Sequence, residues 1–227
     1  MRYKVYSKTQ LEANANELNG RFDKERLEKA KPIDVYDVLE FIGAVVDWKY
    51  LSNDQSVLGA TVFYDGILPV FEKENDKFVA KNIYVNAGTI IIDIGLDESS
   101  NVGRKNFTVM HEVFHFLYHK KSFTKRNGGL KKVLETDIFR SYEEKKKGMT
   151  AIEILEWQAN YMAAAFLIPK NALVNEINNL LLGSIVDSDN IRPMILRKST
   201  IEKLADKFSV SYQAMIYRMQ SLNILRK

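Results

Sequence analysis

The stretch that decides the fold is Thr108–His119, which reads TVMHEVFHFLYH. Its apolar residues recur at helical spacing, which predicts an amphipathic helix that ends near Lys120. It contains all three histidines of the chain, His111, His115 and His119, each four residues from the next. Residues four apart lie on one face of a helix, so the pattern predicts a row of imidazoles.

The spacing of His111, Glu112 and His115 indicates metal chemistry. Four residues advance about 6 Å along a helix, so the two imidazoles can bind one ion, while Glu112 can reach a water on it. Such a water has a pKa of roughly 7, and a carboxylate can take its proton. His119 lies about 12 Å from His111 along the axis, too far to share the ion. A supporting or substrate-facing role for His119 and plain packing both stay open.

A third ligand is expected from a second helix, Thr150–Pro169. Glu153 stands three residues after Thr150, the position that closes a capping box, and so has a structural reason to be there. Glu156 has no such reason and lies among apolar neighbours, so it is the preferred ligand. Asn160, one turn later, is positioned to orient a ligand by hydrogen bonding.

The rest of the chain predicts a sheet and further helices. Five short segments are rich in β-branched and aromatic residues, at 44–51, 57–64, 67–73, 78–85 and 89–96. They predict a small, largely antiparallel sheet, with a hairpin turn at Asn86-Ala87-Gly88 and with Thr89–Ile94 as an exposed strand that holds substrate. Thr9–Lys29 has only a thin apolar stripe, which predicts a helix that packs weakly.

The C-terminal segment Ser199–Leu225 predicts two helices joined by a turn, similar to a helix-turn-helix unit. A helix that reads DNA carries Arg, Lys, Asn or Gln near its start, backed by basic phosphate contacts. The second helix here offers Tyr212, Gln213 and Arg218. The pattern therefore favours an interaction or packing role over direct DNA binding.

Composition limits the remaining possibilities. With 46% hydrophobic and 27% charged residues the chain is typical of a globular protein, and zero Cys excludes disulfides and thiolate metal sites. Neither a signal-like apolar region nor a run long enough for a membrane span is found, so we expect a cytoplasmic protein without membrane contact. From Lys120 to Thr150 there are ten Lys or Arg and four Asp or Glu, a net charge of +6. Such a segment is typical of a solvated loop or a docking patch for an acidic partner.

Two linked motifs carry a family resemblance. They read Arg104-x-x-Phe107-Thr108-x-x-His111-Glu112-x-x-His115-x-x-x-His119 and Glu156-x-x-Ala159-Asn160-x-x-Ala163-Ala164-x-x-Leu167-Ile168-Pro169. Together they resemble the ImmA/IrrE metallo-endopeptidases over about residues 34–225. The resemblance implies an α+β, thermolysin-like minimal metalloprotease core with active-site helices. It also implies zinc bound by His111, His115 and Glu156, with Glu112 as general base.

Members of that family act in bacteria and mobile elements by cleaving helix-turn-helix repressors, so the implied partner is an Xre-type repressor. The chain departs from the family at Phe114, where glycine is usual, and at Gln158, where a second carboxylate is common. The interval between His115 and Glu156 is long and contains the basic segment, which predicts an inserted loop at 120–149.

The expected organisation is an N-terminal helix at 1–31, a peptidase-like domain at 32–190 and a helix-turn-helix-like subdomain at 191–227. Tyr118, Tyr161 and His119 are all candidates for stabilising an oxyanion. Two other functions stay open. One is a regulatory or toxin module that binds a repressor and cleaves little, and the other is a DNA-binding regulator with a structural zinc. The oligomeric state and the scissile bond stay open as well.

Overall fold

The computed structural model describes residues 4–75, 77–98, 101–123, 130–134, 149–182, 188 and 190–226, with residues 130–134 described as backbone only. The fold is α+β, as the sequence predicts. It forms two compact units. The sheet unit comprises Met1–Val5, Val35–Asn101 and Thr108–Asn160, and the helical unit comprises Tyr6–Asp34, Val102–Phe107 and Tyr161–Lys227.

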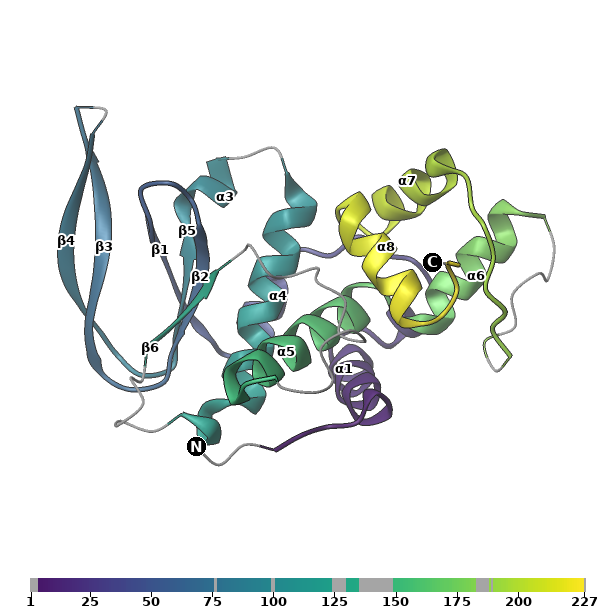
Figure 1. Ribbon diagram of the computed structural model, residues 1–227, viewed down its shortest axis with the longest axis horizontal. Coiled ribbons are helices and arrows are strands. Elements are labelled where there is room, and N and C mark those ends of the chain that lie inside the picture. Colours follow the sequence, from purple (N-terminus) through teal and green to yellow (C-terminus); the bar gives the residue numbers. More distant parts are fainter. Residues whose placement is uncertain are drawn as a thin grey trace. The chain divides into compact units, whose positions relative to one another are not determined.

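The sheet unit is built on a four-stranded sheet with the order β1-β5-β2-β6 (Figure 1). Its strands are β1 (Val45–Lys49), β5 (Thr89–Asp93), β2 (Val57–Val62) and β6 (Leu130–Leu134). β1 and β5 run parallel, and the other pairings are antiparallel. A separate antiparallel pair joins β3 (Gly66–Glu74) to β4 (Lys77–Val85). Largely antiparallel pairing is therefore confirmed, although the strands form two sheets and not one.

The predicted hairpin at Asn86-Ala87-Gly88 is wrong. β4 pairs with β3, whereas β5 pairs with β1 and β2, so this turn carries the chain from one sheet to the other. Gly88 has a φ of +91°, and its N–H donates to the Val62 carbonyl at 2.8 Å. Burial explains the difference. All five residues of β5 are buried and need strand neighbours on both sides for their backbone groups, whereas most of β4 is exposed.

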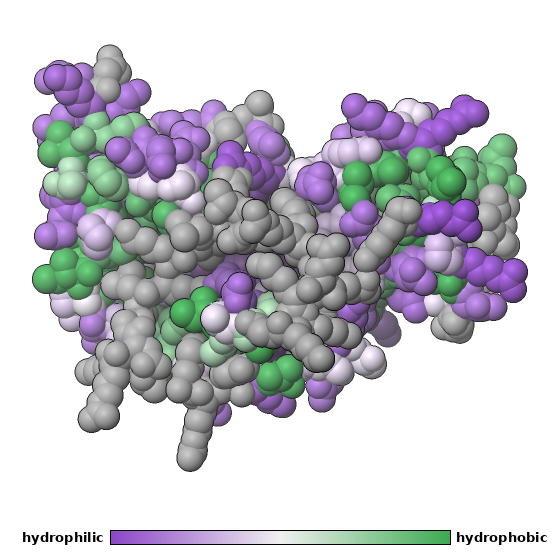
Figure 2. Space-filling model, viewed as in Figure 1, coloured by the Kyte–Doolittle hydropathy of each residue, from purple (hydrophilic) through white to green (hydrophobic). Residues whose placement is uncertain are grey.

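The core of the sheet unit lies on β2 and β5, which are buried along their whole lengths. An apolar cluster continues from them onto the inner face of β3 and β4, and consists of Leu51, Val57, Ala60, Val62, Leu68, Val70, Val85 and Ile91. The outer face of this hairpin is open. Ile67 and Tyr84, which lie opposite each other, are 66% and 68% exposed. Figure 2 shows hydrophobic residues in green beside hydrophilic residues in purple over this hairpin, at the left of the view.

Two long helices contribute to both units. α4 (Val102–Tyr118) begins in the helical unit and continues in the sheet unit, and α5 (Ala151–Leu167) begins in the sheet unit. α5 opens on the predicted capping box. The Thr150 N–H donates to Glu153 Oε2 at 2.8 Å, and the Glu153 N–H donates to Thr150 Oγ1 at 3.3 Å. The sheet unit also contains α2 (Val35–Phe41), α3 (Ile94–Glu98) and a short 3-10 helix, η2 (Lys120–Ser122).

The helical unit contains α1 (Lys8–Phe22), the 3-10 helix η1 (Lys24–Leu27), α6 (Lys170–Leu180), α7 (Lys198–Lys207) and α8 (Tyr212–Ser221). The prediction that the N-terminal helix packs weakly is wrong. Leu11 and Ala15 are fully buried, and Asn19 Nδ2 donates to the Phe166 carbonyl at 3.0 Å. Part of this packing is polar, so an apolar stripe could not reveal it. Within the described residues, no helix combines the length and apolarity that a membrane crossing requires.

α7 and α8 form the predicted pair of helices joined by a turn. Ser211 caps α8, since its hydroxyl accepts from the Ala214 N–H at 3.1 Å. The first turn of α4 packs closely on this connection. A Cβ on Gly103 would lie 2.3 Å from the Ser211 nitrogen, so only glycine allows the approach.

Arg218 of α8, which the sequence offered as a nucleic-acid contact, is fully buried. Its guanidinium donates to both carboxylate oxygens of Glu12, at 2.5 and 2.9 Å, and to the Ile168 carbonyl at 2.9 Å. Burial by itself lowers the pKa of Arg218, but the Glu12 carboxylate outweighs it and raises the pKa above its ordinary value. Arg218 is therefore part of the core of the helical unit and is not available to a nucleic acid.

Candidate metal centre

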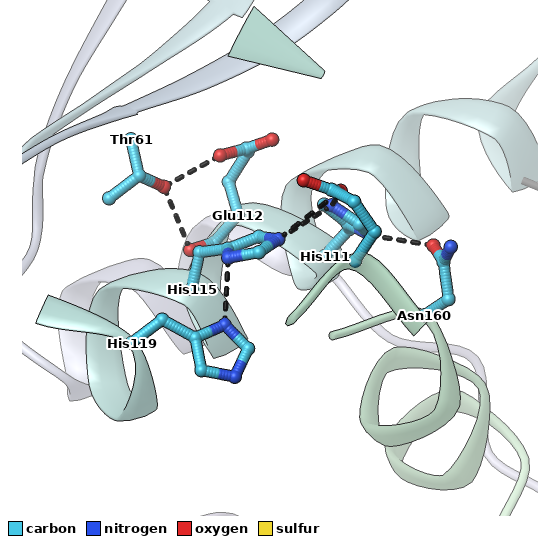
Figure 3. Close-up of polar contacts among 7 residues, drawn as sticks. Thr61, His111, Glu112, His115, His119 and Asn160 are labelled. Atoms are coloured by element: carbon cyan, nitrogen blue, oxygen red, sulfur yellow. Dashed lines mark hydrogen bonds and ion pairs between the residues drawn. The ribbon is translucent and has the colours of Figure 1, made fainter. Parts of the chain in front are cut away.

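The polar face of α4 is buried in the sheet unit. His111, Glu112, His115 and His119 each expose 1% of their surface or less. The three imidazoles follow one another at successive turns, with ring centroids 4.6 and 4.7 Å apart (Figure 3). Burying three imidazoles and a carboxylate costs free energy unless each group gains a hydrogen bond or a cation. The hydrogen-bond partners of these four side chains therefore indicate their chemical role.

Three ligand atoms converge at one end of the row. His111 Nε2 lies 3.0 Å from His115 Nε2, and Glu156 Oε2 lies 3.1 Å from the first and 3.5 Å from the second. Zinc bonds of about 2.0–2.1 Å at tetrahedral angles separate ligand atoms by about 3.3 Å. The triangle therefore has the size that such an ion requires, and two imidazole nitrogens with one carboxylate oxygen suit a first-row divalent metal. These residues can hold a metal ion.

Asn160 of α5 contacts the His111 ring. His111 Nδ1 lies 2.7 Å from Asn160 Oδ1. An amide oxygen only accepts, so Nδ1 carries the proton and donates. In the neutral ring this leaves the lone pair on Nε2, the atom that faces His115 and Glu156. The arrangement agrees with the orienting role that the sequence suggests for Asn160.

His119 stands in the same relation to His115. Their Nδ1 atoms lie 2.8 Å apart, so one donates and the other accepts. If His115 binds metal through Nε2, its Nδ1 carries the proton and His119 is the acceptor. His119 thus contacts the Nδ1 side of the His115 ring. The choice between a supporting role and plain packing stays open.

The two glutamates of α5 have different partners. Glu153 is engaged with the Thr150 backbone and hydroxyl in the capping box. Glu156, one turn further along, directs Oε2 toward both imidazoles. Three residues on a helix turn the direction of a side chain by about 60°, which is enough to assign the two carboxylates to different partners.

Two residues of β2 that the sequence did not single out contact Glu112. Thr61 Oγ1 lies 2.6 Å from Glu112 Oε2 and 3.1 Å from the Glu112 carbonyl oxygen (Figure 3). Gly59 lies against the same side chain, since a Cβ there would be 2.8 Å from Glu112 Cγ. Nothing in the local pattern of β2 marks either residue, because their role depends on a helix about fifty residues away.

The expectation that Thr89–Ile94 is an exposed strand for substrate is wrong. β5 occupies Thr89–Asp93 of this segment and is an inner strand, paired with β1 on one side and β2 on the other. Its backbone groups are already bonded, so it cannot accept another strand. In the described part of the four-stranded sheet the edges are β1 and β6.

The oxyanion candidates are not equivalent. The Tyr161 hydroxyl donates to Glu12 Oε2 at 3.2 Å in the helical unit, and burial raises its pKa. His119 contacts His115, and Tyr118 is partly buried with its ring 6.1 Å from that of Phe114. Phe114 itself is fully buried, so α4 accommodates a phenyl ring at this position.

The basic segment lies largely outside the described residues. Its start is anchored, because the Tyr64 hydroxyl donates to the Phe123 carbonyl at 2.6 Å and the Phe63 and Phe123 rings stack with centroids 4.5 Å apart. The role expected for this segment, as a solvated loop or a docking patch for an acidic partner, stays a prediction.

The sequence matches one family model. It is that of the IrrE N-terminal-like domain of peptidase family M78, and the match covers residues 70–220. This span is more than half of the chain and includes α4 and α5. It confirms the resemblance that the two motifs carry, and it implies a metallopeptidase type of function. No curated protein matches the chain in sequence.

Proposed function

The chain belongs to the peptidase M78 family, and on that premise we propose that it is a zinc-dependent endopeptidase. The observation that carries the proposal is the triangle of His111 Nε2, His115 Nε2 and Glu156 Oε2, with sides of 3.0, 3.1 and 3.5 Å. Glu112 follows the first of these ligands on the same helix. A chelating triangle with an adjacent carboxylate is the arrangement that metal-assisted hydrolysis needs.

Each residue then has a defined task. His111, His115 and Glu156 hold the metal, and zinc bound there polarises a peptide carbonyl and brings the pKa of a water near 7. Glu112 accepts the proton of the attacking water and passes it to the leaving amine. Asn160 and His119 keep the Nδ1 protons of the two ligand rings in place, so that both Nε2 lone pairs face the metal.

The number of ligands favours catalysis over a structural metal. Among the described residues the metal-binding group has three members. Structural zinc sites use four protein ligands, whereas catalytic sites use three and leave a position for water or substrate. His119 does not supply a fourth ligand, because its Nδ1 is 2.8 Å from the far side of the His115 ring.

We assign the substrate to the class of helix-turn-helix repressors of the Xre type, inside the bacterial cell, because that is what the ImmA/IrrE resemblance implies. The net charge of +6 between Lys120 and Thr150 supports selection of an acidic protein surface. An extended peptide pairs with a sheet edge, and β6 is the edge strand next to β2, which contacts Glu112. A folded repressor presents such a peptide only in a linker or a locally opened segment, so cleavage is slow and limited to one region.

The test is incubation of the zinc-loaded protein with the Xre-type repressor encoded beside its gene, followed by mass spectrometry of the products. We expect cleavage between the DNA-binding and oligomerisation parts of the repressor. The Glu112→Gln variant is the matched control, since it retains every ligand and loses the base. An intact repressor in stable complex with the zinc-loaded wild type would overturn the proposal in favour of a regulatory module that binds without cleaving.

A further inference from the structure

We propose that Thr61 and Gly59 of β2 are positioning residues for Glu112, so that the sheet sets the orientation of the general base. The inference rests on the proposed function, because it assigns Glu112 that role. The two residues are two apart on β2, so both face the same side of the sheet, the side on which α4 lies. Between them they contact the carboxylate from two directions.

Thr61 holds one oxygen of the carboxylate. Its hydroxyl is fully buried and lies 2.6 Å from Glu112 Oε2, within the range of a charge-assisted O–H···O⁻ bond. The Glu112 carbonyl oxygen is at 3.1 Å, so the single hydroxyl proton has its shorter and stronger acceptor on the side chain. The bond selects one rotation of the carboxylate, and the β-branched Thr61 side chain is itself stiff in a strand.

Gly59 provides the space that the carboxylate fills. A Cβ at this position would lie 2.8 Å from Glu112 Cγ and 3.0 Å from Oε1, closer than side chains tolerate. Gly59 is not among the residues of positive φ, so its backbone conformation does not require glycine. The close approach of Glu112 is the reason for glycine here, and any side chain would push the carboxylate aside.

β2 therefore does more than support the core. A displacement of about 1 Å at a reacting group lowers the rate by a factor of roughly 100. A residue that fixes the carboxylate therefore affects kcat even though it contacts no metal ligand. The Thr61 hydroxyl bonds to Glu112, which is not one of the three residues that can hold the metal. Its loss should appear in kcat and leave KM and metal content unchanged.

The experiment compares Thr61→Val, which removes the hydroxyl at nearly constant shape, with Thr61→Ser, which retains it. Each variant is assayed for zinc content, melting temperature, and kcat and KM on the repressor that the wild type cleaves. We expect Thr61→Val to bind one zinc, to keep its KM and to lose roughly 10–100-fold in kcat, whereas Thr61→Ser stays near wild type. Gly59→Ala should lower kcat as well, with the hydroxyl still present.

Crystal structures of the zinc-loaded wild type, Thr61→Val and Thr61→Ser give a readout that does not depend on cleavage. The Glu112 carboxylate should rotate in Thr61→Val and keep its wild-type position in Thr61→Ser. An unmoved carboxylate or an unchanged kcat in Thr61→Val would overturn the positioning role, and so would a failure of Thr61→Ser to restore activity. If the wild type itself binds zinc and cleaves nothing, the proposed endopeptidase activity fails, while the carboxylate positions still decide the role of Thr61.

Discussion

One buried polar cluster in the helical unit and one in the sheet unit are composed in opposite ways. In the helical unit, Arg218 and Glu12 supply both charges, and the guanidinium bonds both carboxylate oxygens and the Ile168 carbonyl. In the sheet unit, two imidazole nitrogens and a carboxylate oxygen lie within 3.5 Å of one another. In the first cluster the positive and negative charges balance, whereas the second brings electron-pair donors together.

This difference separates a structural cluster from a functional one. A buried ion pair with satisfied hydrogen bonds is stable within the chain alone, and removal of one partner leaves an uncompensated charge. Electron-pair donors that converge repel one another until a cation binds them. Their arrangement therefore destabilises the metal-free fold, and metal binding stabilises it. Perturbing the helical cluster should therefore change stability and leave the metal content unchanged, whereas perturbing the sheet cluster should lower metal affinity and, with it, the stability that bound metal contributes.

The largest expected effect is the loss of metal from Glu156→Gln. A neutral amide replaces the one anionic ligand, so zinc affinity should fall well beyond the roughly 10–100-fold typical of an outer-shell residue. Glu153→Gln is the matched control three residues away and should cost only a fraction of a kcal/mol, through the capping box. Metal analysis of both purified variants is the measurement. Equal zinc loss in the two would show that α5 presents a different face to the site.

The next effect is a loss of stability in Glu12→Gln. This change leaves the Arg218 guanidinium buried without its counter-charge, and we expect a loss of about 3–5 kcal/mol in the free energy of unfolding. Chemical denaturation measures it, and zinc content per folded chain should be unchanged. The double variant Glu12→Leu, Arg218→Met removes both charges and should lie closer to wild type. A double variant as unstable as Glu12→Gln would mean that the ion pair contributes net stability of its own.

The contrast between the clusters also explains which parts of the fold and of the site could be predicted from the sequence. His111 and His115 lie four residues apart on one helix, so spacing alone predicts their common face, with Glu112 next to the first of them. Glu156 could be chosen because α5 has two glutamates and one capping box, which Glu153 closes. Among the described strands, β1 to β5 are predictable from β-branched and aromatic runs, because that preference is local. β6 is not, since it lies within the segment expected to be an inserted loop.

What could not be predicted depends on pairing between distant segments. The partners of β4 and β5 depend on burial, since β5 is buried along its length and most of β4 is exposed. The sequence does not show this difference, so the hairpin predicted at Asn86-Ala87-Gly88 is wrong. Arg218 reaches Glu12 across 206 positions of sequence, and Thr61 reaches Glu112 across 51. Neither contact leaves a periodic signal, since each needs the register of two elements at once.

A smaller effect is expected from the residues that orient the ligand rings. Asn160→Ala removes the acceptor for the His111 Nδ1 proton, and zinc affinity should fall roughly 10–100-fold. Asn160→Asp keeps an oxygen acceptor and should restore most of the affinity. Competition with a chelator of known zinc affinity measures both variants. If Asn160→Ala bound zinc as tightly as wild type, the tautomer of His111 would not depend on this contact.

The smallest effect concerns a group of three charges at the surface of the helical unit, where one ammonium faces two carboxylates. Lys31 Nζ lies 2.8 Å from Asp23 Oδ2 and 2.8 Å from Glu25 Oε2. Its hydrogen bonds lower the pKa of Asp23 and of Glu25. Carboxyl groups with a depressed pKa stabilise the fold above their unfolded pKa of about 4, and this contribution is lost as the pH falls through the lowered value.

Lys31→Met should therefore lower the melting temperature slightly at pH 7, with a difference from wild type that disappears in strong acid. Because the side chains of Lys31 and Asp23 are 36% and 33% exposed, added salt should weaken the effect, as screening does for exposed pairs. Thermal melts from pH 2 to 7 at two salt concentrations test this, and Lys29→Met is the control, since its nitrogen is 3.9 Å from Glu25. A chelator should change neither difference, because none of these charged residues belongs to the metal-binding group. A difference that grew in acid would reverse the sign argued from the carboxyl pKa values.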